Sequence, residues 1–364
     1  MNRHEETHAA MVTMGDVARQ AGVSVTTVSH VVNSTRRVSA AAERAVRDAI
    51  AATGYVPNSI ARSLVTASTR SIGLVISTVS NPYFSELVSA IESTVMEAGY
   101  TLLLADPHDE PERERQVVDA LRARRVDGLL LATSEDESGL RRYVDHPGGE
   151  SLPIVLIDRL ASTNFDQVGV DNEQPMAGLV RHLAELGHGR IGMVTGLDGL
   201  TTTVERVKGY RRGLSDGGLP YASALVASGA SDVEPAHQAV HHLLDLPDPP
   251  TALVIGNNHM MVGVLRALHE RRLRVPDDVA LVGFDDTEWA DLLPAPLTAI
   301  AQPCQEIGQT AVRLLLSRLD DGTLPPRTIR FDPVVVHRSS CGCSVSERSD
   351  YLSPRGGTSP AEEP

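Results

Sequence analysis

Residues 13–32 read TMGDVARQAGVSVTTVSHVV, and this stretch decides the fold of the N-terminal region. It contains two short helical patterns that are separated by the turn Gly22–Ser24. Thr13 is placed to cap the first helix, and Asp16 lies three residues later, near the positive end of the helix dipole. The last residue of the turn is a serine, which can cap a second helix over Val25–Val32.

The second helix has one apolar face and one polar face. Val28, Val31 and Val32 are spaced at i, i+3 and i+4, so they form a single buried stripe. Its outer surface then carries small polar side chains, namely Thr26, Thr27, Ser29 and His30. Such side chains let a helix enter the DNA major groove, so the pattern is typical of a helix-turn-helix. A plain three-helix packing module is the alternative.

A third helix and a basic charge balance extend this region. Ser39 begins a helical pattern that runs through Ala52, and Gly54 ends it. Nearby arginines can hold phosphates, namely Arg36, Arg37, Arg44 and Arg47. Residues 1–70 carry a formal charge of +3, whereas the rest of the chain carries −17. A small basic head on an acidic body suits a protein that touches nucleic acid with one end only.

From Ser71 onward, apolar runs alternate with amphipathic helical patterns. The runs predict strands at Ile72–Ser77, Thr101–Ala105, Gly128–Ala132, Ile154–Ile157, Ile191–Thr195, Ala252–Ile255 and Val279–Phe284. Intervening helices are predicted at Pro82–Ala98, Glu112–Ala123, Pro175–Leu186 and Met260–Arg272. Continuous apolar strands indicate parallel sheets that are covered by helices on both faces. Because these elements are too many for one sheet of ordinary size, we expect two lobes, with a ligand bound between them.

The segment that joins the two regions has a short helical pattern of its own. After Asn58, the apolar residues Ile60 and Leu64 stand at i and i+4. A helix this short is marginal in water, so we expect it to fold only when DNA or a second copy covers the apolar stripe. Leu64 could then wedge into the minor groove. An ordinary linker with chance hydrophobic residues is the alternative.

Composition excludes several classes of protein. The 364 residues are 41% hydrophobic, which is enough for a sizeable core, yet no apolar run approaches the ~20 residues of a membrane span. The polar N-terminus lacks a secretory signal, and three cysteines are too few for a disulfide framework, so we expect a cytoplasmic protein. The thiols of Cys341 and Cys343 alone are weak evidence for a metal. We find no phosphate-binding glycine loop and no nucleophile elbow, and we expect no cofactor and no catalytic residue.

The domain organisation follows from these patterns. We expect two disordered tails, at residues 1–12 and 339–364, the second of which is rich in Ser, Gly and Pro. Between them we expect a helix-turn-helix DNA-binding domain, a hinge helix with its linker, and a two-lobed effector-binding and dimerisation domain, at 13–57, 58–70 and 71–338.

The chain resembles the LacI/GalR family of bacterial transcription regulators over roughly residues 12–340. The densest match lies within Asp16–Asn33 and continues at Tyr55–Asn58 and Ala61–Leu64. Further matches are Ser71–Leu74, Asn81–Phe84, Val126–Gly128, Leu186–His188, Val275–Val279 and Gly283–Asp285. The resemblance implies an all-α helix-turn-helix head with an α/β, periplasmic-binding-protein-like sensor. It also implies a homodimer on a near-palindromic DNA operator, controlled by a small-molecule effector, expected to be a sugar or sugar derivative.

Matching positions carry the family's binding residues over to this chain. The DNA-binding residues would be Val25, Thr26, Thr27, Ser29, His30, Asn33, Ala61 and Leu64. The effector-binding residues would be Tyr83, Phe84, Asp158, Arg206, Asn258, Asp285 and Trp289. The guanidinium fork of Arg206 suits two adjacent hydroxyls or a carboxylate, and Trp289 could stack on a sugar face.

Two positions depart from branches of the family. Asn258 stands where many sugar-responsive members have an acidic residue, although an amide still bonds hydroxyls. Leu200 stands where the purine-responsive branch has arginine, which argues against a purine effector. Two other classes of function share parts of the pattern. A periplasmic solute-binding protein has the lobes but no use for residues 13–55, and a doubly wound enzyme with an appended head would turn over its ligand.

Overall fold

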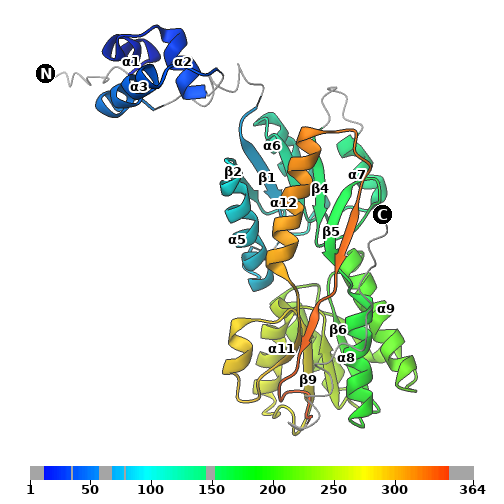
Figure 1. Ribbon diagram of the computed structural model, residues 1–364. Coiled ribbons are helices and arrows are strands. Elements are labelled where there is room, and N and C mark those ends of the chain that lie inside the picture. Colours follow the sequence, from blue (N-terminus) through cyan, green and yellow to red (C-terminus); the bar gives the residue numbers. More distant parts are fainter. Residues whose placement is uncertain (1–11, 34–35, 57–67, 78, 145–151, 344–364) are drawn as a thin grey trace, which may run out of the picture. The chain divides into compact units, whose positions relative to one another are not determined.

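The computed structural model describes residues 12–33, 36–56, 68–77, 79–144 and 152–343 (Figure 1). The chain divides into two compact units, residues 1–69 and residues 70–364. Within the described ranges, no helix is both long enough and apolar enough to cross a membrane.

The first unit contains the three predicted helices, α1 (Met14–Ala21), α2 (Val25–Asn33) and α3 (Ala40–Thr53). A reciprocal capping box starts α1, because the backbone N–H of Thr13 donates to the Asp16 carboxylate at 2.9 Å and the Asp16 N–H donates to the Thr13 hydroxyl at 3.4 Å. The sequence therefore predicted the start of α1 correctly.

A small apolar core holds the three helices together. Val17, Val28 and Val46 each contribute one fully buried side chain, from α1, α2 and α3 respectively. The core is completed by Ala18, Ala49 and Tyr55. The predicted stripe of α2 faces this core, although Val31 and Val32 are only half-buried.

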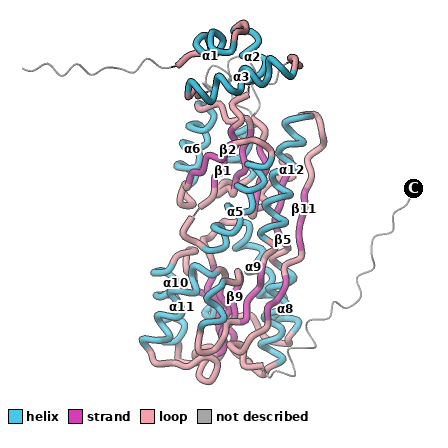
Figure 2. The backbone as a smooth tube through the Cα atoms, turned by 60° about the vertical axis from the view of Figure 1, so that its left-hand side comes forward, coloured by secondary structure: helices cyan, strands magenta, loops and turns pink. Residues whose placement is uncertain are grey.

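The second unit contains two lobes, each built on a six-stranded sheet. The first lobe holds β1 (Ser71–Val75), α5 (Pro82–Glu97), β2 (Thr101–Ala105), α6 (Pro111–Ala123), β3 (Gly128–Leu131), α7 (Glu137–Val144), β4 (Ile154–Ile157), β5 (Asp166–Val170), α12 (Cys304–Asp320) and β11 (Thr328–Phe331). Its strands are all parallel, in the order β11-β5-β4-β3-β1-β2. Figure 2 shows β11 beside β5 at one edge.

The second lobe has the same strand arrangement. It holds α8 (Glu173–Glu185), β6 (Ile191–Thr195), α9 (Thr201–Asp216), η1 (Ser223–Leu225), β7 (Val226–Ser228), α10 (Val233–Leu244), β8 (Ala252–Ile255), α11 (Asn258–Glu270), β9 (Ala280–Phe284), η2 (Glu288–Leu292), β10 (Thr298–Ala301) and β12 (Val334–Val336). The sheet order is β12-β10-β9-β8-β6-β7, and only β12 is antiparallel to its neighbour. The chain crosses between the lobes after β5, after β10 and after β11. The predicted two-lobed α/β architecture is therefore correct.

Most of the apolar strands are buried on both faces, as their composition predicts, whereas the edge strand β2 is half-buried to exposed. Ile72 and Leu74 of β1 pack in one hydrophobic cluster with α5 and α12, whereas Val75 packs in another cluster with α6 and α7. Since both faces are covered, residues 72–75 of β1 are all buried, and only the first residue, Ser71, is partly exposed.

Two helices of the second lobe approach each other closely, and this contact positions the site. A Cβ added at Gly209 of α9 would lie 2.4 Å from the Glu173 carbonyl oxygen of α8, and one added at Gly213 would lie 2.5 Å from the Ala177 carbonyl oxygen. Only glycine permits this approach at both positions. It brings Arg206, on the same helix, beside the start of α8.

The sequence predicted a disordered tail from residue 339, and this prediction is wrong for the first residues of that tail. Ser340 has no exposed surface, and its hydroxyl accepts from the Thr298 N–H at 2.8 Å and donates to the Leu281 carbonyl at 2.5 Å. The described chain to Cys343 thus packs on the second lobe. A composition rich in serine and glycine misled the sequence analysis, because these small side chains fit a tight buried turn. The rest of the tail and residues 1–11 lie outside the described residues.

Candidate functional site

The outer face of α2 exposes some of the predicted reading residues. Val25 is 50% exposed and Thr26 is exposed, whereas Thr27, Ser29 and His30 are half-buried. The Thr27 hydroxyl lies 2.9 Å from that of Ser24, whose oxygen caps the helix by accepting the Thr27 N–H at 3.1 Å.

The end of α2 is closed by a side-chain contact. The Asn33 amide donates to the Ser29 hydroxyl at 3.2 Å, so both side chains are partly engaged within the helix. The other two predicted DNA-binding residues, Ala61 and Leu64, lie outside the described residues.

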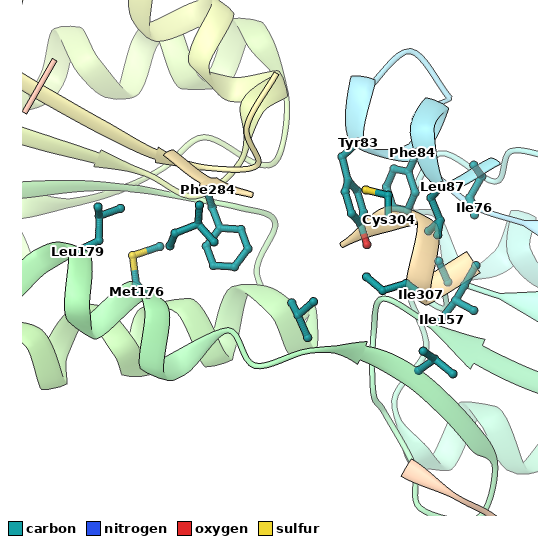
Figure 3. Packing of buried hydrophobic residues seen from close by; sticks show 14 of the residues in the cluster. Ile76, Tyr83, Phe84, Leu87, Ile157, Met176, Leu179, Phe284, Cys304 and Ile307 are labelled. Atoms are coloured by element: carbon teal, nitrogen blue, oxygen red, sulfur yellow. The ribbon is translucent and has the colours of Figure 1, made fainter. Parts of the chain in front are cut away.

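A cavity lies where the carboxyl ends of the strands from both lobes meet. The empty space inside it is about 560 Å³, part of which is open to solvent. Figure 3 shows buried apolar side chains of the main hydrophobic cluster, with Tyr83, Phe84 and Cys304 on the first lobe and Phe284 on the second. Of these, Tyr83 and Phe84 line the cavity. The cavity is lined by Asn81, Tyr83, Phe84, Asp109, Asp158, Arg159, Met193, Gly196, Leu200, Thr202, Thr203, Arg206, Ser231, Gly256, Asn257 and Asp285.

Asp158 and Asp285 occupy corresponding places in the two lobes. Each directly follows the fourth strand counted from one edge of its sheet, β4 or β9. Each has a left-handed backbone, with φ of 63° and 69° respectively, and each is at most 7% exposed. A non-glycine residue in this conformation is uncommon and is often found at a functional site, and aspartate tolerates it better than most residues.

The first lobe contributes a network of buried polar side chains. The Tyr83 hydroxyl donates to the Asp158 carboxylate at 2.9 Å, and the Arg159 guanidinium lies 3.7 Å from the same carboxylate. Arg159 also pairs with Asp109 at 2.5 Å. Burial raises the pKa of Asp158 above its ordinary value, against the opposing effect of the neighbouring arginines.

The second lobe contributes Arg206, which is fixed on several sides. Its Nε donates to the Asn172 side chain at 2.9 Å, and its Nη1 donates to the Gly256 carbonyl at 2.5 Å. The guanidinium lies 3.6 Å from the centre of the Phe284 ring and 3.9 Å from the Asp285 carboxylate. This arrangement holds the guanidinium plane in one orientation at the cavity wall.

The carboxylate of Asp285 accepts a hydrogen bond from the segment that follows β10. The Gln302 side chain donates to this carboxylate at 2.6 Å. Burial raises the pKa of Asp285, although Arg206 and Gln302 act in the opposite direction. A carboxylate that is buried at a cavity wall offers strong acceptors to a ligand that brings hydroxyl donors.

The prediction for Asn258 has a more complex outcome. Its neighbour Asn257 lines the cavity and caps α11, with its side chain accepting the Met260 N–H at 2.8 Å. Asn258 is 2% exposed, and neither its side-chain oxygen nor its side-chain nitrogen has a hydrogen-bond partner within the described residues. A ligand-binding role for Asn258 therefore stays a prediction.

The expectation that Trp289 stacks on a ligand in the cavity is corrected. Trp289 lines a separate surface hollow on the second lobe, with Val262, Leu265, Arg266 and His269 of α11. It follows β9 only five residues after Phe284, but the short helix η2 carries it away from the cavity. Trp289 is close to the end of β9 in the sequence, but this closeness does not predict the turn that the chain makes at η2.

The sequence analysis missed most of the other lining residues. Three helices begin at the cavity, and their first residues supply several of them, namely Asn81, Thr202, Thr203 and Asn257. The ends of strands supply Arg159 and Gly196. Their common signal is the position just after a parallel strand, where ligands of such sheets bind.

Comparison with known proteins agrees with both units. Residues 13–58 match the family described as "Bacterial regulatory proteins, lacI family", and residues 180–341 match the "Periplasmic binding protein-like domain". The chain is 36% identical to the ribose operon repressor of Escherichia coli (strain K12), over 91% of this chain and all of that protein. This chain belongs to the LacI family.

Other relatives in the LacI family have names and titles that describe different regulators and ligands. The HTH-type transcriptional repressor PurR of Vibrio atlanticus is 33% identical over 91% of this chain and 98% of its own. A lac repressor dimer bound to operator and an anti-inducer has a TM-score of 0.81 at 29% identity, covering 91% of this chain and 99% of its own. A complex of the regulator CelR with cellobiose has a TM-score of 0.68 at 30% identity, covering 90% and 99%. This LacI-family chain is thus a transcriptional regulator with a helix-turn-helix domain.

Proposed function

We propose that this chain represses transcription and that a small carbohydrate, bound between its two lobes, controls its affinity for an operator. The observation that carries the proposal is that buried charged side chains from both lobes line one cavity: Asp158 from the first lobe, and Arg206 and Asp285 from the second. A ligand that contacts both sets would couple the positions of the two lobes.

The chemistry of the cavity suits a sugar. A sugar ring offers hydroxyl groups around its edge and C–H groups on its faces. Asp158, Arg206 and Asp285 supply acceptors and donors for the hydroxyls, while Phe84 and Leu200 supply apolar surface. Leu200 also brings no charge to the position at which the purine-responsive branch carries arginine. We therefore favour a carbohydrate over a purine, although PurR proteins are among the relatives.

The DNA partner is proposed from α2 and from the relatives. Val25 and Thr26 expose a methyl-rich and hydroxyl-bearing surface that suits base edges in the major groove. We propose that two copies bind a near-palindromic operator, as a homodimer, because the lac repressor relative is a dimer on its operator. Since this partner is chromosomal DNA, we place the protein in the cytoplasm.

Effector binding would act on DNA through the geometry of the lobes. Three connections cross between the lobes. A change in the angle between the lobes would move the N-terminal end of the second unit relative to the second lobe. Both signs of coupling are compatible with these residues: the ligand acts as an inducer if it favours the DNA-free state, and as a corepressor if it favours the bound state.

The test screens the full chain against a carbohydrate library by thermal shift, with Arg206→Lys as the matched variant. We expect at least one sugar to raise the melting temperature in a concentration-dependent way and to change operator affinity. Lysine keeps the charge of Arg206 but loses the planar fork, so it should weaken binding of that sugar about ten-fold or more.

Two outcomes would overturn the proposal. If no sugar shifts the melting temperature, or if a sugar that does so leaves operator affinity unchanged, the cavity does not control repression by a carbohydrate. We propose no catalytic role for the cavity, and we expect the bound sugar to be recovered chemically unchanged. Turnover of the sugar by the purified chain would favour the enzyme alternative.

A further inference from the structure

Four potential metal ligands come together in the second lobe, away from the cavity residues described above. They are His182 on the last turn of α8, His337 directly after β12, and the pair Cys341 and Cys343. One ligand atom from each residue lies within 4.8 Å of all the others. The two histidine rings meet edge to face with their centres 4.7 Å apart, and the two sulfur atoms are 3.1 Å apart.

We propose that these four residues form a Cys₂His₂ site for a divalent cation of the zinc class. Zinc bonds of about 2.0–2.3 Å to nitrogen and sulfur require ligand atoms roughly 3.3–3.8 Å apart at the corners of a tetrahedron. The ligand atoms lie within 4.8 Å of one another, so rotations of the four side chains would bring them to this spacing. Two thiolates and two neutral imidazoles around a dication also give a site with no net charge, which suits a buried place.

The backbone around the cysteines is shaped to aim both sulfur atoms at the histidines. Gly342 has a φ of 84°, a left-handed conformation that favours glycine, and its N–H donates to the Ser339 carbonyl at 3.0 Å. This turn places the two cysteine side chains on the same side. The surrounding hydrogen bonds of Ser340 to the Thr298 N–H and the Leu281 carbonyl hold the turn against the sheet.

Burial and the neighbouring groups suit ligation. Cys341 has no exposed surface, and Cys343 and His182 are at most 5% exposed. The Thr298 hydroxyl lies 3.4 Å from the Cys341 sulfur, and a hydroxyl at this place is typical of the hydrogen bonds that support a metal-bound thiolate.

A second cluster, His237, His241 and Glu270, is a poorer candidate. It lies on the surface, where Glu270 is more than half exposed. The Arg271 guanidinium donates to Nδ1 of His241 at 2.9 Å, and its positive charge opposes a cation at the same imidazole. This exposed cluster therefore provides a control for the buried one.

The predicted role of the metal is to fasten the end of the described chain to α8. His182 belongs to that helix, while the other three ligands follow β12. Loss of the metal would free the two segments from each other and leave polar ligand groups in a buried place.

The test uses the full chain, purified under reducing conditions without added metal and analysed for zinc. We expect about one zinc per chain. Cys341→Ser and Cys343→Ser should each lose most of it, while His237→Ala should retain it. Chelation should lower the melting temperature of the wild-type chain by about 4 °C or more, and readdition of Zn²⁺ should restore it.

Cobalt substitution keeps the test valid if a cysteine variant fails to fold. Co²⁺ added to the metal-free wild-type chain should give the intense ligand-field bands of a tetrahedral site and the charge-transfer band of two thiolates. A chain that binds neither Zn²⁺ nor Co²⁺ under reducing conditions would overturn the proposal. Full zinc retention by a folded Cys341→Ser variant would do the same, and so would loss of zinc from His237→Ala alone.

Discussion

At the scale of single residues, the cavity holds carboxylates in surroundings that disfavour their charge. Asp158 and Asp285 are buried, and burial raises the pKa of both above the ordinary value of 3.8. A group of this kind reduces the stability of the ligand-free protein at neutral pH. We interpret these two buried carboxyl groups as part of a binding site, because the hydroxyl groups of a ligand would donate hydrogen bonds to them.

Replacing Asp285 by asparagine tests this interpretation through pH. The aspartate's contribution to stability is fully present below about pH 4 and is lost as pH rises through the raised pKa of the folded state. Asparagine tolerates the left-handed backbone and carries no charge. We therefore expect Asp285→Asn to raise the melting temperature at pH 7 by about 2 °C or more, and the gain to vanish toward pH 4.

The control for this prediction is an aspartate with the opposite shift. Hydrogen bonds from Arg274 lower the pKa of the exposed Asp278, so Asp278→Asn should not stabilise the protein at pH 7. A lower melting temperature for Asp285→Asn at pH 7 would show that the charge stabilises the free protein. The same variant should also bind the effector more weakly, because it loses a charged acceptor.

At the scale of elements, short helices depend on their caps and on their packing. Helix α1 has eight residues, fewer than a helix needs to be stable alone in water. Its capping box and the buried side chain of Val17 compensate for this length. The orientation of α2 depends on α1, because both pack on the same small core.

Thr13→Ala removes one half of the capping box. Because the Asp16 N–H then loses its acceptor, we expect the head to lose about 1 kcal/mol of stability. Amide hydrogen exchange in α1 of the full chain should become about five-fold faster.

The control for the cap is Arg19→Ala. Arg19 forms an exposed ion pair with Asp16 at 2.9 Å, and such pairs contribute little, so exchange in α1 should change much less. Equal effects of the two substitutions would mean that the hydroxyl of Thr13 has no special part in starting the helix.

At the scale of the whole molecule, DNA binding and effector binding are assigned to different units. The head carries a positive formal charge and the sensor a negative one, so attraction to DNA is confined to one end of the sequence. Residues 57–67, which join the two units along the chain, lie outside the described residues.

Leu64→Ala tests the part of this segment that the sequence analysis singled out. If Leu64 wedges into the minor groove, its truncation should lower operator affinity about ten-fold or more. Effector affinity should stay unchanged, because the cavity is formed by other residues. Fluorescence anisotropy with a labelled operator and thermal shift with the effector measure the two properties separately.

Leu292→Ala is the matched control, since Leu292 is 81% exposed on the sensor and should leave operator affinity unaltered. If Leu64→Ala binds the operator as tightly as the wild type does, the wedge hypothesis is wrong.

Local patterns in the sequence were enough to predict the head and the two-lobed α/β fold. The side-chain cap of Thr13 and the left-handed backbones of Gly22 and Gly54 act within a few residues, so their signals can be recognised locally in the sequence. The strands that were predicted are mainly apolar. The strand β5 was missed because its residues, DQVGV, include polar side chains that only their partners satisfy, such as Asp166 with Arg318 at 2.7 Å.

Most of the cavity lining and the cluster of potential metal ligands could be recognised only from the tertiary structure. Arg159 and Asp109 are fifty residues apart, and Cys341 and His182 are still further apart, yet each pair meets in space. Trp289 shows the converse, because it is near a site residue in sequence and lies elsewhere in the fold. The sequence determines helices, caps and buried strands because those depend on neighbours along the chain. Which distant side chains share a cavity depends on how the sheets and their crossing connections pack, and no local pattern contains that information.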